Sequence, residues 1–197
     1  MCKVLYIKAN AVREDESNTF MISDHFVNEY KKYHPKDEII TLDLNKEKIR
    51  SLTRYDILSA IADKKNRNKN HPVLKYAYQF AEADKYIVAE PLWNSSEAIL
   101  NYIDYVSIMD IAFKYTEYGT VGLLKGKKAV NIVSRKEAEG ACSFCFNELG
   151  KDYLKAIFAF FGITDFLMIN ADQLVAGDQP DFDPESISKT EEKAKYF

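Results

Sequence analysis

The chain has 197 residues, of which 47% are hydrophobic and 29% charged, and its net charge at pH 7 is −3. This length and composition predict one globular domain over residues 1–197, and the slight negative charge argues against general nucleic-acid binding. No apolar run approaches the roughly 18 residues that span a bilayer, and the N-terminus lacks a signal-peptide pattern. We therefore expect a soluble cytoplasmic protein with no membrane partner.

Five short apolar segments predict buried strands. In chain order they are residues 4–7, 38–42, 86–89, 129–133 and 166–169. Helical patterns separate them. These are an apolar stripe at Ile22, Phe26, Tyr30 and Tyr33 capped by Ser17 or Thr19, then residues 72–83, about 94–110, 154–161 and an acidic C-terminal segment. Alternation of strands and helices predicts an α/β fold with a parallel sheet, and five strands permit the order 2-1-3-4-5.

Two stretches carry weaker patterns. Residues 45–70 are polar, and the basic cluster at positions 64–69 favours a solvated loop over a site for an anion. Residues 112–118 alternate imperfectly and predict a short extended excursion, followed by a turn at Gly119, Gly122 and Gly126.

Three loops that follow predicted strands are candidates for ligand binding, because open α/β sheets bind ligands at the carboxyl ends of their strands. The first, residues 9–19, offers hydroxyls and a helix N-terminus that suit a phosphate, a role compatible with plain helix capping. It contains no GxGxxG motif, which disfavours a Rossmann dinucleotide site. The second, residues 91–94, is anchored by proline and carries an indole, although an ordinary turn would look the same. The third is residues 134–137.

The sequence does not favour a thiol-redox, metal or hydrolytic site. Cys142 and Cys145 have CxxC spacing, but two unrelated thiols are favoured because the motif falls late and has no second pair for zinc. None of the three histidines lies in a motif. We therefore predict no metal site, no Ser-His-Asp triad and no catalytic carboxylate pair.

Seven segments together carry a resemblance to a known family. They are residues 3–10, 17–19, 91–94, 113–116, 122–124, 134–135 and 161–164. In this order and spacing they resemble the FMN-dependent NADH-azoreductase and NADH:quinone oxidoreductase family, some members of which are labelled acyl carrier protein phosphodiesterase. The resemblance spans roughly residues 3–170. It implies a flavodoxin-like three-layer sandwich, FMN as cofactor, NADH or NADPH as electron donor, and a homodimer.

The resemblance also implies roles for particular residues. Ser17, Asn18 and Thr19 match a phosphate-binding triplet, and Asn10 lies near a second phosphate-contacting position. The segment that lines the isoalloxazine ring is matched by Pro91, Leu92, Trp93, Asn94 and Ser95, with Ser95 in place of a common phenylalanine. The third loop is matched by Ser134 and Arg135, whereas Lys136 and Glu137 replace two glycines that approach the pyrimidine edge. Because glycine permits close approach and positive φ, this loop is expected to take another path or to weaken FMN binding.

Aromatic residues are candidates for the substrate side. Tyr115 and Trp93 would form a wall of the flat slot, although Tyr115 is equally explained as an exposed strand residue. The aromatic residues of 158–161 would reach a neighbouring subunit's site if the family's dimer forms, but their spacing favours a core helix face.

The resemblance implies that the enzyme transfers two electrons from NAD(P)H through FMN to quinones, azo compounds or nitroaromatics, in a ping-pong mechanism. No side chain is then required as an essential acid, since solvent can deliver protons. Two alternatives remain: a flavodoxin-like electron carrier, and a degenerate member that binds FMN weakly or not at all. Phosphodiesterase activity is disfavoured because the sequence offers neither a metal site nor an activated nucleophile.

Overall fold

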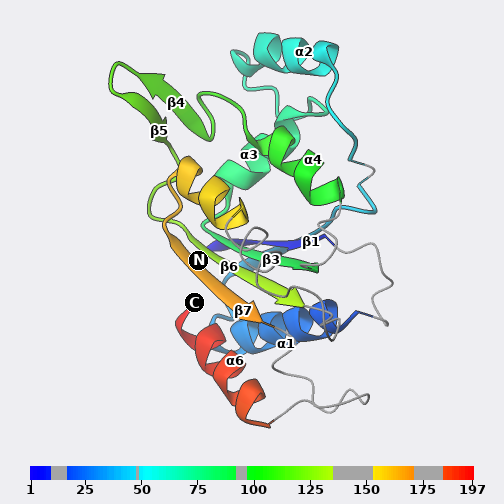
Figure 1. Cartoon of the computed structure of the whole chain (residues 1–197), viewed down its shortest axis with the longest axis vertical. Helices are drawn as coiled ribbons and strands as arrows, with labels where there is room; N and C mark the ends of the chain where they lie inside the picture. The colour runs from blue at the N-terminus through cyan, green and yellow to red at the C-terminus, as the bar shows by residue number, and fades with distance from the viewer. Residues whose placement is uncertain (10–16, 48, 92–96, 135–152, 171–183) are drawn as a thin grey trace, which may run out of the picture.

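The computed structural model describes residues 1–9, 17–47, 49–91, 97–134, 153–170 and 184–197. At its centre is a five-stranded parallel sheet in the order β2-β1-β3-β6-β7 (Figure 1). The strands are β1 (Lys3–Lys8), β2 (Glu38–Asp43), β3 (Lys85–Pro91), β6 (Lys128–Ser134) and β7 (Asp165–Asn170). The predicted order 2-1-3-4-5 and the α/β fold class are confirmed.

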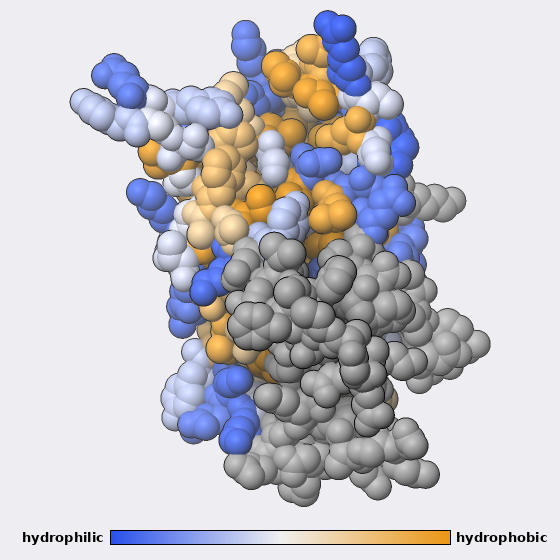
Figure 2. Space-filling view, in the orientation of Figure 1, coloured by the Kyte–Doolittle hydropathy of each residue, from blue (hydrophilic) through white to orange (hydrophobic). Residues whose placement is uncertain are grey.

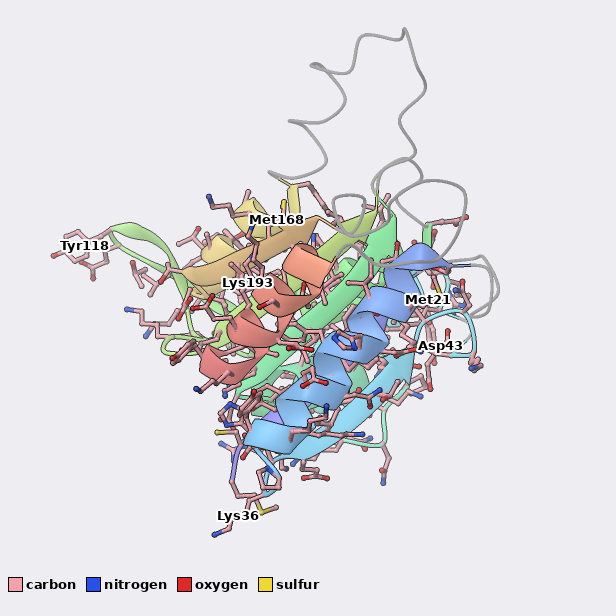
Figure 3. The ribbon with its side chains drawn as sticks, turned by 90° about the horizontal axis from the view of Figure 1, so that it is seen from below. Met21, Lys36, Asp43, Tyr118, Met168 and Lys193 are labelled. Carbon is pink, nitrogen blue, oxygen red and sulfur yellow. The ribbon has the colours of Figure 1, made fainter. Side chains whose placement is uncertain are left out.

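Helices cover both faces of the sheet, which explains why the central strands are mostly apolar rather than alternating. On one face, α1 (Asn18–Tyr33) and α6 (Pro184–Tyr196) lie side by side over Tyr6, Ile87 and Val130 (Figure 3). On the other face, the helical residues 153–161 and the helices α3 (Leu74–Glu82) and α4 (Glu97–Val106) pack over Leu5, Tyr86 and Val88. No helix in the described part of the chain is long and apolar enough to cross a membrane.

Helix α1 begins as the sequence predicts. Ser17 has extended backbone angles, and its hydroxyl accepts a hydrogen bond from the Phe20 amide, as an N-cap does. Ile22, Phe26 and Tyr30 are buried against the sheet, but Tyr33 is about half exposed because it lies in the last turn, beyond the sheet. The stripe is therefore correct except for Tyr33.

The polar stretch 45–70, for which the sequence predicted no helix, contains the helix α2 (Arg54–Lys64). A capping box starts it: the Thr53 hydroxyl accepts from the Asp56 amide, and the Asp56 carboxylate accepts from the Thr53 amide. The basic cluster makes ion pairs, with Lys64 on Asp110 and Lys69 on Glu82. The predicted loop is therefore confirmed for residues 65–69, whereas Lys64 is the last residue of α2, and Lys64 and Lys69 are explained by protein partners.

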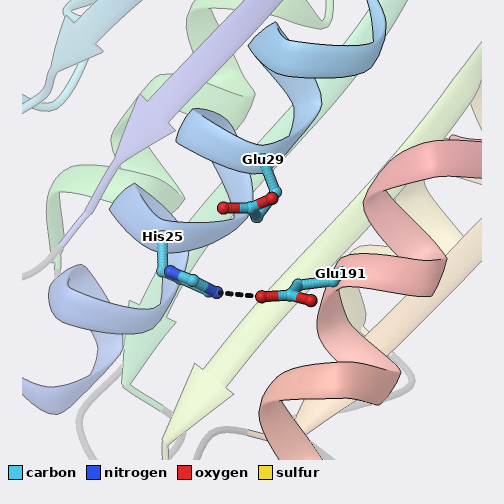
Figure 4. A group of neighbouring side chains, drawn as sticks. All are labelled: His25, Glu29 and Glu191. Atoms are coloured by element: carbon cyan, nitrogen blue, oxygen red, sulfur yellow. Dashed lines mark ion pairs between the residues drawn. The ribbon is translucent and has the colours of Figure 1, made fainter.

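The C-terminal helix is tied to α1 by aromatic and ionic contacts. The Phe197 ring lies 5.7 Å from the Phe26 ring, centroid to centroid. His25 Nε2 faces Glu191 Oε1 at 3.7 Å, and Glu29 next to them accepts a hydrogen bond from Lys32 (Figure 4). The ligand atoms of His25, Glu29 and Glu191 lie within 4.8 Å of one another, a grouping that the sequence did not indicate. Its contacts are those of an interhelical ion pair.

The extended excursion at 112–118 is one arm of an antiparallel hairpin formed by β4 (Phe113–Thr116) and β5 (Gly119–Gly122). The preceding helix, expected to end near residue 110, ends at Val106. At the hairpin base, a Cβ on Gly122 would lie 2.2 Å from the Phe161 carbonyl carbon, so only glycine permits this approach. The hairpin projects away from the sheet, with Tyr118 at its tip (Figures 1 and 3).

Candidate active site

The three loops singled out in the sequence start from neighbouring strand ends. Lys8 of β1 is in register with Ala89 of β3, and Pro91 of β3 with Ser134 of β6. One residue further on, the Ala9 amide donates to the Ala89 carbonyl oxygen at 2.9 Å. The parallel sheet therefore brings the starts of all three loops to one edge, at the switch point between β1 and β3.

Many of the predicted site residues lie outside the described residues. These are Asn10, Leu92, Trp93, Asn94, Ser95, Arg135, Lys136 and Glu137. For Asn18, Pro91 and Ser134 only the backbone is described, at the start of α1 and at the ends of β3 and β6. The roles of all these residues stay predictions.

The start of α1 has the chemistry of an anion site. Ser17 and Thr19 are both buried there, just beyond the end of β1, and the first turn holds no acidic residue. A helix N-terminus carries partial positive charge and directs amide N–H groups outward, so a phosphate fits this place. The capping role of Ser17 is thus observed, and a phosphate-binding role is compatible with it.

A buried cation ends the first strand. Lys8 is 6% exposed, and its ammonium nitrogen lies 3.1 Å from Asp24 Oδ1 and 4.9 Å from the centre of the Phe20 ring. Both partners belong to the first two turns of α1. Lys8 therefore adds positive charge beside the start of α1. The sequence signal for it was a lysine next to the apolar run 4–7.

A buried acid lies one residue before the end of β3. Glu90 is 4% exposed, and its Oε1 accepts a hydrogen bond of 3.2 Å from Asn131 Nδ2 on β6. Burial raises the pKa of the Glu90 carboxyl to about 7, although the hydrogen bond from Asn131 lowers it. No role for Glu90 was predicted from the sequence. A Glu and an Asn within otherwise apolar strands were the missed signal.

Known proteins show the same fold and similar sequences. A model of the flavodoxin-like fold family matches residues 2–195. FMN-dependent NADH:quinone oxidoreductases from Clostridium beijerinckii and Clostridium acetobutylicum are 52% and 53% identical to this chain, each over the full length of both chains. The chain belongs to this flavodoxin-like family of FMN-dependent NADH:quinone oxidoreductases and azoreductases.

A solved structure of a family member has the same fold. The FMN-dependent NADH-azoreductase from Bacillus anthracis, in complex with FMN, superposes with a TM-score of 0.78 at 25% identity, covering 100% of this chain and 99% of the other. The expected family, fold and class of FMN-dependent oxidoreductase are confirmed.

Tyr115 does not lie near the carboxyl ends of the strands in its own chain. It is 68% exposed on β4, in the hairpin whose base touches Phe161 and Gly162, the residues that lead into β7. That base therefore lies at the amino ends of the strands, opposite the candidate site. A role for Tyr115 at a flavin requires a second copy of the chain.

Proposed function

We propose that this flavodoxin-like protein is an FMN-dependent reductase that transfers two electrons from NADH or NADPH to quinones, azo compounds or nitroaromatics. The observation that carries the proposal is that the predicted FMN loops start from neighbouring strand ends at one edge of the sheet. The names of relatives at 52% and 53% identity support the same activity.

The cofactor would be held through two kinds of contact. Ser17, Thr19 and the N-terminus of α1 would bind the phosphate, with Lys8 adding positive charge. Pro91 to Ser95 and Ser134 to Glu137 would line the ring. FMN, when bound, would supply the hydride and electron-transfer chemistry. The residues bind it, orient it and keep water from the ring.

The activity is tested with protein reconstituted with FMN. NADH oxidation should depend on an added quinone, and plots of reciprocal rate against reciprocal NADH concentration at several quinone concentrations should be parallel, as a ping-pong mechanism requires. Intersecting lines would show that both substrates bind together. No turnover with any quinone, azo dye or nitroaromatic would refute the reductase proposal.

We also propose that the enzyme works as a homodimer. The exposed aromatic side chains of Tyr115, Tyr118 and Phe160 gather around the hairpin and the helical residues 153–161, where the Phe113 and Phe160 rings lie 4.8 Å apart. Apolar side chains extend over this face and over α2 in Figure 2. Aromatic side chains are enriched at interfaces between subunits. Sedimentation equilibrium should give twice the chain mass; the mass of one chain would exclude the dimer.

Whether the cofactor binds tightly is tested at the third loop. Lys136 and Glu137 replace the glycines of relatives, so replacing both by glycine should lower the dissociation constant of FMN. An unchanged constant would show that these side chains do not hinder binding. Absence of FMN binding in either form would favour the degenerate alternative. A cytoplasmic location stays a prediction, which cell fractionation can check.

A further inference from the structure

Glu90 is a buried acid at the candidate site that the reductase scheme leaves without a role. Its side chain lies on the face of the sheet that packs against α4 and the helical residues 153–161, the same face as Val88 and Asn131. It is the last but one residue of β3, directly before the loop that is predicted to line the FMN ring. A change of charge on Glu90 would therefore occur directly before the predicted FMN loop.

The polar atoms around Glu90 indicate that its carboxyl carries a proton. Asn131 is fully buried, and its Oδ1 has no hydrogen-bond partner in the described part of the chain. A carboxylate cannot donate to this oxygen, whereas a carboxylic acid can donate to it while accepting from Asn131 Nδ2. A protonated Glu90 would thus add a second hydrogen bond to the one observed from Asn131 Nδ2, and the acid and the amide would satisfy each other. The raised pKa of Glu90, about 7, agrees with this geometry.

The described residues offer the carboxylate form of Glu90 no compensating charge, since burial and the hydrogen bond from Asn131 are what shift its pKa. On the helical residues 153–161, Tyr153 lies within electrostatic range of Glu90 and of Asp104 on α4, and both carboxyls raise the pKa of Tyr153 after burial does. Lys8, at the end of β1, belongs with Tyr6 on the opposite face, where it pairs with Asp24. The described residues thus place no cation against Glu90, and a buried carboxylate without one is unstable.

The reductase reaction needs a proton that the hydride does not bring. NADH, one proton and a quinone give NAD⁺ and a quinol. The hydride carries two electrons and one proton, so the second proton must come from a protein group or from water. We propose that Glu90, held by Asn131, stores this second proton: its O–H bond breaks as the quinone oxygen gains a proton, and water then returns a proton to the carboxylate.

This inference rests on the proposed function, and Glu90→Gln tests it. Glutamine keeps the size of the side chain and the hydrogen bond from Asn131 but has no acidic proton to give. The matched control is Glu38→Gln, since Glu38 is an exposed strand glutamate at the opposite, amino end of the sheet. Quinone reduction by the FMN-loaded forms is measured from pH 5 to pH 9, as kcat and as kcat/KM.

In the wild type and in Glu38→Gln, kcat/KM for the quinone should fall as the pH rises through about 7. In Glu90→Gln it should be lower by about 100-fold and lack that ionisation, because general acid groups contribute on this order. A Glu90→Gln profile that follows the wild type would overturn the proposal. So would a uniform loss that keeps the same ionisation, since it would show a merely structural role.

Two further measurements separate this proposal from the proposed function. The FMN dissociation constant is determined for each form, and the free energy of unfolding is followed against pH without cofactor. If wild type and Glu90→Gln both bind FMN and reduce quinone with the same pH profile, the role of Glu90 is refuted but the reductase proposal stands. Forms that never bind FMN overturn the reductase and, with it, the proton delivery. Unfolding curves of wild type and Glu90→Gln that stay parallel over pH would show that Glu90 holds no proton near neutrality.

Discussion

Asn131 Nδ2 donates a hydrogen bond of 3.2 Å to Glu90 Oε1, between two buried strands and at the edge of the sheet where the predicted FMN loops begin. This pair places an ionisable group in the core, directly before a loop with a predicted role in cofactor binding. Its energetic consequence can be measured without any cofactor.

The pair predicts how stability depends on pH. The pKa of Glu90 is raised from 4.5 to about 7 in the folded protein, so the folded state binds its proton more tightly than the unfolded state does. Stability therefore falls as the pH rises from about 4.5 to 7, by about 3 kcal/mol at roughly 1.4 kcal/mol per unit. In urea unfolding, the free energy of unfolding of the wild type should fall by this amount between pH 4.5 and pH 7, relative to that of Glu90→Gln. A difference that stays constant with pH would contradict the assignment.

Ser17→Ala is expected to affect both folding and binding. It removes the N-cap of α1, which should lower the free energy of unfolding by about 1 kcal/mol. It should also weaken FMN binding, since the same hydroxyl lies at the proposed phosphate site. Thr53→Ala is the matched control, because Thr53 caps α2, which does not start from a strand end of the candidate site. It should lose similar stability, while its FMN dissociation constant, measured by flavin fluorescence, stays at the wild-type value. Equal FMN affinity in both variants would remove Ser17 from the site.

Gly122→Ala is expected to destabilise the chain strongly. The added Cβ would meet the backbone of Phe161 at 2.2 Å, and backbone atoms cannot move aside as a flexible side chain does. The expected loss is roughly 3 kcal/mol, in the range of overpacked sites. Gly119→Ala, in the same hairpin, meets no atom within 4 Å and is strained only by its φ of +114°. The unfolding temperature of Gly122→Ala should therefore be well below that of Gly119→Ala. The reverse order would show that the hairpin does not pack against residues 161–162.

Tyr115→Ala tests whether a second copy completes the site. Because Tyr115 is 68% exposed, its loss should leave the unfolding temperature unchanged. If the dimer brings Tyr115 to the partner's flavin, kcat/KM for quinones should fall roughly tenfold, or about 1.4 kcal/mol. Tyr196→Ala, an exposed tyrosine at the end of α6 and away from the hairpin, is the control and should keep the wild-type value. Unchanged turnover in Tyr115→Ala would assign this side chain to the surface alone.

The sheet could be predicted from the sequence because strands covered on both faces must be apolar throughout. The runs 4–7, 86–89 and 129–133 are therefore visible as strands, and the structure extends each run by one or two residues at either end. The grouping of the three loops follows from the strand order. Helix α2 was missed because Tyr55, Leu58 and Ile61 are exposed and its polar flanks resemble a loop, although Thr53 and Asp56 formed a recognisable capping box.

The remaining features depend on tertiary packing. The raised pKa of Glu90 arises from burial beneath helices that come later in the chain, which no local pattern reveals. The position of Tyr115 at the amino end of the sheet, opposite the candidate site, follows from the contact of Gly122 with Phe161. The meeting of His25 with Glu191 joins residues that are far apart in sequence.

The most direct test of the central claim is an absorbance spectrum of the purified protein, recorded with and without added FMN and again after gel filtration. An FMN-dependent reductase should retain the flavin bands at close to one FMN per chain, and NADH should bleach them under anaerobic conditions. A protein that stays colourless after incubation with FMN would contradict the claim and favour a member of the family that has lost its cofactor.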